Sequence, residues 1–183
     1  ADGRFPRMLH TATGWWIEEA GAPAPQPPLT EPAEADVVVI GGGYLGMWTA
    51  WHLLERDPGT RVVLLERERC GHGPSGRNGG FALRGAAAPY DVMVESVGSE
   101  DAAALWRWTE AELDVLEDLA GDAFRRVGSL RLAVDAEERE ELRAEHDAMR
   151  NDGIAVEWID EPGGRLAGRF TAALRHPPDG ALQ

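Results

Sequence analysis

The feature that most constrains this chain is a glycine-rich turn that directly follows an apolar run. Residues 37–40 read VVVI, and residues 41–46 read GGGYLG, a G-x-G-x-x-G pattern. In such a turn the first glycine allows the tight bend, the second lets a phosphate approach the main chain, and the third lets the next helix pack closely on the strand. The N-terminus of that helix offers unpaired N–H groups and the positive end of a dipole. The sequence therefore predicts a dinucleotide-binding turn.

Residues 36–66 read as a βαβ unit around this turn. A helix is expected through Arg56, and a second apolar run without alternation follows at residues 62–65, which is typical of parallel strands covered on both faces. The crossover should be right-handed. Glu66 ends the second strand, twenty residues after Gly46, where its carboxylate can accept hydrogen bonds from both hydroxyls of an adenosine ribose. A 2′-phosphate would meet like charge there, so NAD or FAD is favoured over NADP.

A second glycine-rich stretch, CGHGPSGRNGGF at residues 70–81, distinguishes FAD from NAD. NAD domains normally continue with a helix here, whereas a backbone this open can run alongside a second long ligand segment such as ribityl and flavin. Ser75, Arg77 and Asn78 would supply a hydroxyl, a guanidinium and an amide to the phosphates, the ribityl hydroxyls or the flavin edge. A flexible loop without a ligand is the alternative for this stretch.

The composition excludes several functions. The chain has 18 arginines, no lysine and 32 acidic residues, for a net charge of −14. P-loop and Schiff-base lysines are therefore absent, and a broad nucleic-acid footprint is disfavoured. Residues 91–161 hold 21 of the acids against 7 arginines, which favours a solvated helical surface. One cysteine and scattered histidines provide no metal-binding spacing, and no signal-peptide pattern or run of about 18 apolar residues is present, so a cytoplasmic enzyme without metal is expected.

The rest of the chain predicts an N-terminal arm and an α+β segment. Residues 21–34 contain five prolines and should form an extended tether, and Trp15 and Trp16 before it should pack back on the main body. A helix is expected from an N-cap at Ser99 to Gly121, then a half-buried strand, a charged helix and a second alternating segment, before a loop-like end at residues 176–183. The expected core face of the first helix consists of Leu105, Trp108, Leu116 and Leu119, and the expected strand alternates Leu130, Leu132 and Val134 with Arg131 and Ala133.

The chain resembles the FAD-dependent amine oxidoreductases of the D-amino acid oxidase and glycine oxidase family, and most closely their γ-glutamylputrescine oxidase-like branch. The resemblance rests on ADVVVIGGGYLGMWTAWHL, VVLLE, PSGRNGGF and GSLRLAVDAEEREELRAEHDAM, with the tryptophan-containing leader and the closing DGALQ. It covers nearly the whole chain. SGRNGG directly after the ribose acid is its most specific part.

The resemblance implies an FAD site and an amine-oxidising activity. Family members oxidise a carbon–nitrogen bond by hydride transfer to flavin N5, and the cofactor supplies the difficult chemistry. Glu66 would hold the adenosine ribose, and Arg67 would border the adenine. The segment from Ser75 to Phe81 would pass the pyrophosphate, ribityl and isoalloxazine. The implied cofactor-binding residues are Gly41, Gly43, Tyr44, Leu45, Gly46, Glu66, Arg67, Ser75, Gly76, Arg77, Asn78, Gly79, Gly80 and Phe81, and no catalytic side chain is named.

The fold class expected from the resemblance is α/β, a Rossmann-like FAD-binding domain with the start of an α+β substrate domain. The expected divisions are residues 1–34 for the arm and tether, 35–98 for the FAD-binding part and 99–183 for the helical segment and truncated substrate domain. Family proteins are considerably longer, so we expect an amino-terminal portion that associates with a C-terminal remainder or companion chain, because an incomplete sheet would leave an open edge. The substrate would be a small amine or amino acid.

Several alternatives stay open at this stage. One alternative is the FAD-binding subunit of a multi-subunit dehydrogenase that uses an acceptor other than oxygen, and another is a non-catalytic nucleotide-binding fragment. Cys70 and His72 are candidates for a covalent flavin link, although a small buried thiol and an ordinary loop histidine are the simpler interpretations. Residues 73–77 do not complete a G-x-S-x-G nucleophile elbow, because Arg77 stands where the second glycine is required.

Overall fold

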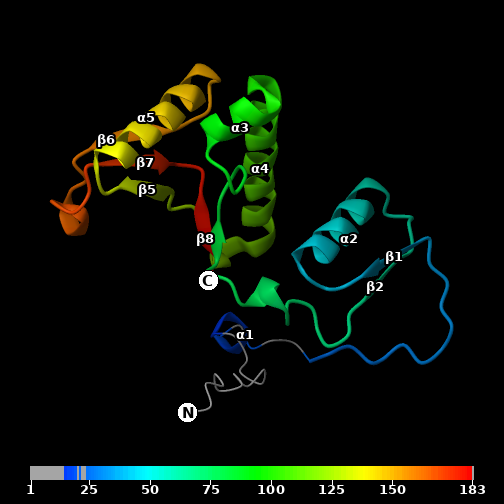
Figure 1. Ribbon diagram of the computed structural model, residues 1–183. Helices are drawn as coiled ribbons and strands as arrows, with labels where there is room; N and C mark the ends of the chain where they lie inside the picture. The colour runs from blue at the N-terminus through cyan, green and yellow to red at the C-terminus, as the bar shows by residue number, and fades with distance from the viewer. Residues whose placement is uncertain (1–14, 20, 22–23, 183) are drawn as a thin grey trace, which may run out of the picture. The chain divides into compact units, whose positions relative to one another are not determined.

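The chain forms two compact units, residues 1–79 and residues 80–183, each with its own packing. The computed structural model describes residues 15–19, 21 and 24–182, and Figure 1 shows their helices and strands. None of the helices in this described part combines the length and the apolar composition needed to cross a bilayer. The two units are treated separately below.

The first unit contains the expected βαβ element. Strand β1 (Val37–Ile40) leads into helix α2 (Tyr44–Arg56), which returns the chain to strand β2 (Val62–Leu65). The two strands pair in parallel, with Val37 opposite Val62 and Ile40 opposite Leu65. A bidentate ion pair between Arg61 and Asp36 and a bond from the Arg61 N–H to the same carboxylate join the strand beginnings. The predicted arrangement of strand, helix and parallel strand is thus confirmed.

The described part of the N-terminal arm contains a short helix, α1 (Trp15–Glu19). The Ile17 side chain lies against the second glycine-rich segment, since a Cβ on Gly76 would stand 2.9 Å from Ile17 Cδ1. The side chains of Trp15 and Trp16, which we expected to be buried, lie outside what the structure describes. Residues 24–34 form no helix or strand, in agreement with their proline content.

The second unit combines three helices with two small antiparallel sheets. One sheet has the order β5–β7–β6 and the other β3–β8–β4. Helix α5 covers one face of the first sheet, and helices α3 and α4 lie side by side (Figure 1). The bounds are β3 Phe81–Ala82, α3 Tyr90–Val97, α4 Ser99–Ala120, β4 Phe124–Arg125, β5 Ser129–Ala133, α5 Ala136–Asn151, β6 Glu157–Asp160, β7 Ala172–His176 and β8 Gly180–Leu182.

The buried face of α4 differs from the expected one. Trp108 is 71% exposed and Leu119 is 52% exposed, so these two residues do not form the core. The buried residues of α4 are Ala102, Ala103, Trp106 and Leu113. The Trp106 ring meets Tyr90 edge to face at a centroid distance of 4.9 Å. The small alanines let neighbouring elements approach closely, and a pattern based on leucines alone misses that face.

Strand β5 buries a different residue from those expected. Ala133 is fully buried, whereas Leu130 is 44% exposed and Val134, just beyond the strand, is 55% exposed. Leu132 is partly buried, and Arg131 pairs with Glu145 of α5 while 42% of its side chain stays exposed. The predicted strand is confirmed, but the predicted leucine face is buried only in part.

Two boundaries need correction as well. Ser99 is the first residue of α4 and not its cap: Gly98 holds the cap position, and the Ser99 hydroxyl donates to Asp152 Oδ1 at 2.6 Å. The end of the chain is not a loop, because β8 pairs with both β3 and β4. Strand β8 is short, and its three residues Gly180–Leu182 carry no strand pattern of their own.

His176 ends β7 in a buried charged environment. Its ring is 7% exposed, and Nε2 has no hydrogen-bond partner. Burial lowers the pKa of His176 to about 4, with Arg84 and Arg131 acting in the same direction and Asp179 opposing them. The folded state therefore keeps this imidazole neutral.

The packing of α2 on β1 depends on Gly46. A Cβ at this position would stand 1.9 Å from the Gly41 carbonyl oxygen and 3.3 Å from Val39 Cγ1. We expect Gly46→Ala to lower the free energy of unfolding by about 2 kcal/mol, because backbone must move to admit the methyl group. Gly73→Ala is the matched control, since a Cβ there would meet nothing within 4 Å. Urea unfolding measures both, and equal stability of the two variants would contradict the packing described.

His176 should make stability depend on pH. The unfolded state binds a proton near pH 6.5 and the folded state does so only near pH 4, so stability falls as pH drops through that window. Between pH 7 and pH 5 we expect the wild type to lose about 2 kcal/mol of unfolding free energy more than His176→Gln loses. Burial also raises the carboxyl pKa of Glu145, which makes stability change with pH in the opposite direction. This contribution is the same in the wild type and in the variant, so it drops out of the comparison. Parallel pH profiles for the two proteins would show that His176 is not kept neutral by the fold.

Candidate functional site

The two glycine-rich segments of the first unit meet at Gly42. The Gly71 N–H donates to the Gly42 carbonyl oxygen at 2.8 Å, and the Gly42 N–H donates to Glu66 Oε2 at 2.8 Å. Next to them, the Gly41 N–H continues the ladder between β1 and β2 by donating to the Leu65 carbonyl at 2.8 Å. The predicted phosphate turn and the predicted ribose acid are therefore joined directly.

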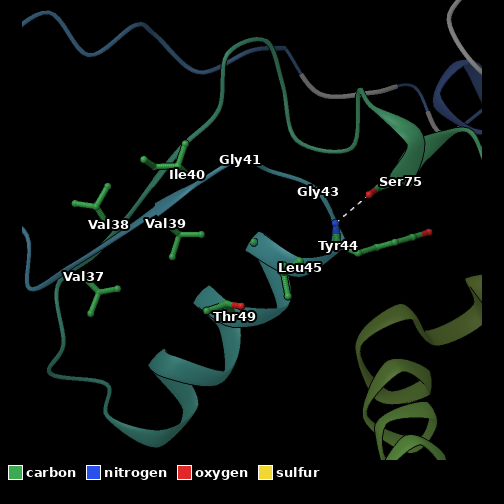
Figure 2. A pocket seen from close by; sticks show the side chains of 11 residues that line it. Val37, Val38, Val39, Ile40, Gly41, Gly43, Tyr44, Leu45, Thr49 and Ser75 are labelled. Atoms are coloured by element: carbon green, nitrogen blue, oxygen red, sulfur yellow. Dashed lines mark hydrogen bonds between the residues drawn. The ribbon is translucent and has the colours of Figure 1, made fainter. Parts of the chain in front are cut away.

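The start of α2 is capped by a residue from the second segment. The Tyr44 N–H donates to Ser75 Oγ at 3.0 Å, as Figure 2 shows, and Gly43, the cap residue, makes no side-chain cap of its own. Asn78 Nδ2 donates to the Tyr44 hydroxyl at 2.9 Å and to the Ser75 carbonyl at 2.7 Å. Ser75 lies in a short 3-10 turn, Pro74–Gly76, which holds the hydroxyl over the helix end. The Ser75 oxygen thus lies at the N-terminus of α2, where the positive end of the helix dipole attracts negative charge.

Glu66 is held as a carboxylate by main-chain donors. Oε1 accepts the Glu68 N–H at 2.9 Å and Oε2 accepts the Gly42 N–H. These two bonds, the one from Glu68 first, keep the pKa of Glu66 below its usual value. Each oxygen retains lone pairs, because an ionised carboxylate accepts about four hydrogen bonds. Glu66 is exposed and ionised, so it can accept further donors such as ribose hydroxyls.

A cavity runs along β1 and the first turn of α2. Its volume is about 560 Å³, and Figure 2 shows the side chains around it. One end is apolar, with Val38 and Ile40, and the other end carries the glycine turn and Ser75. Gly41 has φ +102°, and a Cβ there would meet nothing within 4 Å, so the main chain at the turn is open to a ligand.

These features fit the diphosphate and ribose of FAD. The turn has a glycine in the left-handed region, the helix end carries no acidic residue in its first turn, and the ionised carboxylate lies beside the turn. An anion placed at the start of α2 would meet the positive dipole end and the Ser75 hydroxyl, and hydroxyls placed beside it would meet Glu66. The donor set matches the chemistry of a dinucleotide.

The structure brings most of the sequence-predicted residues of the first unit into one region. Arg77 folds back on the loop, with Nε donating to the His72 carbonyl at 3.1 Å. Two residues extend outward: Leu45 is 83% exposed, and the Arg67 side chain, 91% exposed, contacts Glu68. Gly79 closes the first unit.

Gly80 and Phe81 belong to the second unit. Phe81 starts β3 and is 77% exposed, and the Gly80 carbonyl accepts the Leu182 N–H at 2.7 Å. These contacts attach the last residues of the SGRNGGF motif to β8. Both contacts lie within the second unit.

Sequence reasoning missed the roles of Gly42 and Gly71, and it was wrong in expecting the Cys70 thiol to be buried, because Cys70 is exposed. A Cβ on Gly42 would stand 2.6 Å from Cys70 Sγ, so the middle glycine of the turn is required for close packing of the two segments. The signal available in the sequence was a glycine at the second of three consecutive glycine positions, which the G-x-G-x-x-G pattern leaves unspecified. Cys70 is a free thiol that fills this contact.

His72 makes ordinary side-chain contacts. Its Nε2 lies 2.9 Å from Glu68 Oε2, and its Nδ1 accepts a hydrogen bond from Arg69 Nε at 3.4 Å. Within the described residues, no three His, Cys, Asp or Glu side chains gather in a way that could hold a metal ion. The polar groups at this site are donors and acceptors for an organic ligand.

About half of this chain is similar in sequence to known oxidoreductases. Over 95 residues the chain is 41% identical to gamma-glutamylputrescine oxidoreductase of Escherichia coli, covering 52% of this chain and 22% of that protein. Over 92 residues it is 39% identical to the probable oxidoreductase OrdL of Haemophilus influenzae, covering 50% of this chain and 21% of that protein. The chain thus spans about a fifth of the length of these two relatives.

Solved structures share the fold. L-proline dehydrogenase from P. horikoshii has a TM-score of 0.63 at 23% identity, over 83% of this chain and 39% of that one. Glycine oxidase from Bacillus cereus has a TM-score of 0.55 at 22% identity, over 81% of this chain and 40% of that one. Residues 36–183 match the family model described as DAO, FAD dependent oxidoreductase. The chain belongs to the DAO family of FAD-dependent oxidoreductases.

Proposed function

We propose that this chain forms the FAD-binding part of an enzyme that oxidises the carbon–nitrogen bond of an amine or amino acid. The observation that carries the proposal is the junction of the two glycine-rich segments, where Ser75 caps α2 and the ionised Glu66 holds the Gly42 N–H. Family membership supports the cofactor, and the names of the relatives support an oxidoreductase.

Each polar group has a role in holding FAD. The glycine turn and the end of α2 bind the pyrophosphate through main-chain N–H groups, and Glu66 accepts the hydroxyls of the adenosine ribose. Ser75 presents its hydroxyl to the phosphates. Asn78 presents its amide oxygen as an acceptor to the ribityl hydroxyls, because its Nδ2 group donates to the Tyr44 hydroxyl and to the Ser75 carbonyl. The proposed set is Gly41, Gly43, Tyr44, Leu45, Gly46, Glu66, Arg67, Ser75, Gly76, Arg77, Asn78, Gly79, Gly80 and Phe81.

FAD, when bound, supplies a flavin that accepts a hydride from the carbon attached to nitrogen. The residues named here bind and orient the cofactor. Glycines in the turn keep side chains away from the diphosphate, and the bond from Asn78 to the Ser75 carbonyl fixes the loop that leads toward the flavin.

The substrate class follows from the relatives' names. Gamma-glutamylputrescine, glycine and L-proline, named in three of the matched proteins, share a carbon bonded to an amine or amide nitrogen. Both oxidases and dehydrogenases occur among them, so the proposal covers oxygen and other electron acceptors. Hydrogen peroxide formation in air distinguishes the two: an oxidase produces it in proportion to substrate consumed, whereas a dehydrogenase requires an added acceptor.

A further part of the proposal is that additional polypeptide covers β1. Val38 is 54% exposed and Ile40 is 86% exposed, and in the described residues the sheet of the first unit has only two strands. Parallel strands are normally covered on both faces and flanked by further strands. A C-terminal remainder or a companion chain fits that requirement, since the relatives are about five times the length of the matched region.

Flavin binding is tested first through Glu66. We expect the purified enzyme to show flavin absorption bands and Glu66→Gln to raise the dissociation constant for FAD by about tenfold, because the neutral amide loses charge-assisted acceptance of the ribose hydroxyls. Flavin fluorescence titration of the apoprotein measures this. Glu55→Gln is the matched control: it removes the same charge from an exposed position of α2 that lines neither cavity. An unchanged affinity in Glu66→Gln would show that the ribose lies elsewhere.

The companion segment is tested by mass. We expect the intact mass of the active enzyme to exceed that of these 183 residues, either in one polypeptide or with a second chain. Native mass spectrometry combined with an amine-oxidation assay gives the answer. Turnover by a preparation that contains these residues alone would contradict the requirement for further polypeptide.

A further inference from the structure

The N-terminal tether lies beside the residues proposed to hold the adenosine end of FAD. A second cavity of about 1010 Å³ is lined on one side by residues 24–29 and on the other by residues 63–70 and His72. Glu66 and Arg67 are part of that second wall. The family match begins only at residue 36, so residues 24–29 are outside the region that this chain shares with the family model.

We infer that residues 24–29 form the outer wall of the site for the adenosine end of FAD. This inference rests on the proposed function, because it takes Glu66 as the residue that holds the ribose. The occupant is the adenine ring with its ribose. The tether therefore contacts the ligand as well as linking the N-terminal arm to the βαβ unit. The cavity is at the upper end of the range of about 300–1,000 Å³ usual for small-molecule sites, so an adenosine has room beside Glu66.

The chemistry of the two walls suits an adenosine. Residues 24–29 read APQPPL and carry no charge, so the wall consists of apolar proline rings and the apolar Leu29, which is 60% exposed, together with Gln26. Gln26 adds an amide that can both donate to and accept from a heterocycle. The opposite wall supplies the Glu66 carboxylate and the exposed Arg67 guanidinium. An apolar face opposite a few polar groups is the usual composition of a nucleoside site.

The tether is also suited to act as a rigid wall. Proline fixes φ near −65° and favours an extended chain, so little conformational entropy remains to be lost when a ligand binds. Ile17, which precedes the tether in sequence, lies against Gly76 at the other end of the loop that starts after Glu66. The arm therefore contacts or faces both ends of residues 66–76.

Glycine substitutions in the tether test the inference. In the purified enzyme, Pro25→Gly, Pro27→Gly and Pro28→Gly combined should raise the dissociation constants for FAD and for ADP by about tenfold each, since a flexible wall must be ordered on binding. Pro32→Gly is the matched control, because it loosens the same tether outside the cavity, and it should stay within about twofold of the wild type. Riboflavin, which lacks the adenosine, should bind the triple variant and the wild type equally.

A second measurement uses the unaltered enzyme and does not depend on how the variants fold. ADP alone should slow chymotryptic cleavage after Leu29, and riboflavin should not. If the wild type binds FAD but the triple variant keeps its affinity, or ADP gives no protection, residues 24–29 are not a wall of the site and the proposed function stands. If the wild type binds no FAD at all, the proposed function is wrong and the inference fails with it.

Discussion

The site depends on one carboxylate that holds two main-chain N–H groups. Glu66 accepts from Gly42 in the first glycine turn and from Glu68 in its own segment. Carboxylates that accept main-chain donors stay ionised, and here they also fix backbone that has no side chains of its own to hold it. Among the described residues, the other contacts between the turn after β1 and the loop after β2 are the Gly71-to-Gly42 bond and side-chain contacts. The residue that fits a ribose is therefore also a structural residue.

The same arrangement explains why the second glycine-rich segment matters. Ser75 reaches the first N–H of α2 across 31 residues of sequence, and Asn78 reaches the Tyr44 hydroxyl across 34. A helix normally takes its cap from the residue that precedes it, but Gly43 has no side chain to offer. The cap from the loop replaces it, and in doing so it brings the loop's hydroxyl and amide to the helix end. The two motifs form one structural unit, because the loop supplies the side-chain cap that the glycine turn lacks.

The sequence predicted what is local and missed what depends on partners. The strand, helix and parallel strand of residues 37–65 were predictable because apolar runs and a glycine turn specify them within about thirty residues. The inward faces of α4 and β5 were not, because Trp106 packs against Tyr90 of α3 and Arg131 pairs with Glu145 of α5, and the periodicity of one element does not identify its partners on another. The close contact of Gly42 with Cys70 was equally hidden, since nothing in a glycine pattern says which neighbour needs the space.

Charge adds a reason why an anion would choose the first unit. Residues 1–79 hold ten acids and seven arginines, whereas residues 80–183 hold 22 acids and 11 arginines. Helices α4 and α5 carry their own acids in the first turn, Glu100 and Asp101 in one and Glu137 and Glu138 in the other. Helix α2 carries none, so its positive end is not neutralised by its own sequence. A diphosphate would meet an available dipole end in the less acidic unit, and like charge at the starts of the two long helices of the other.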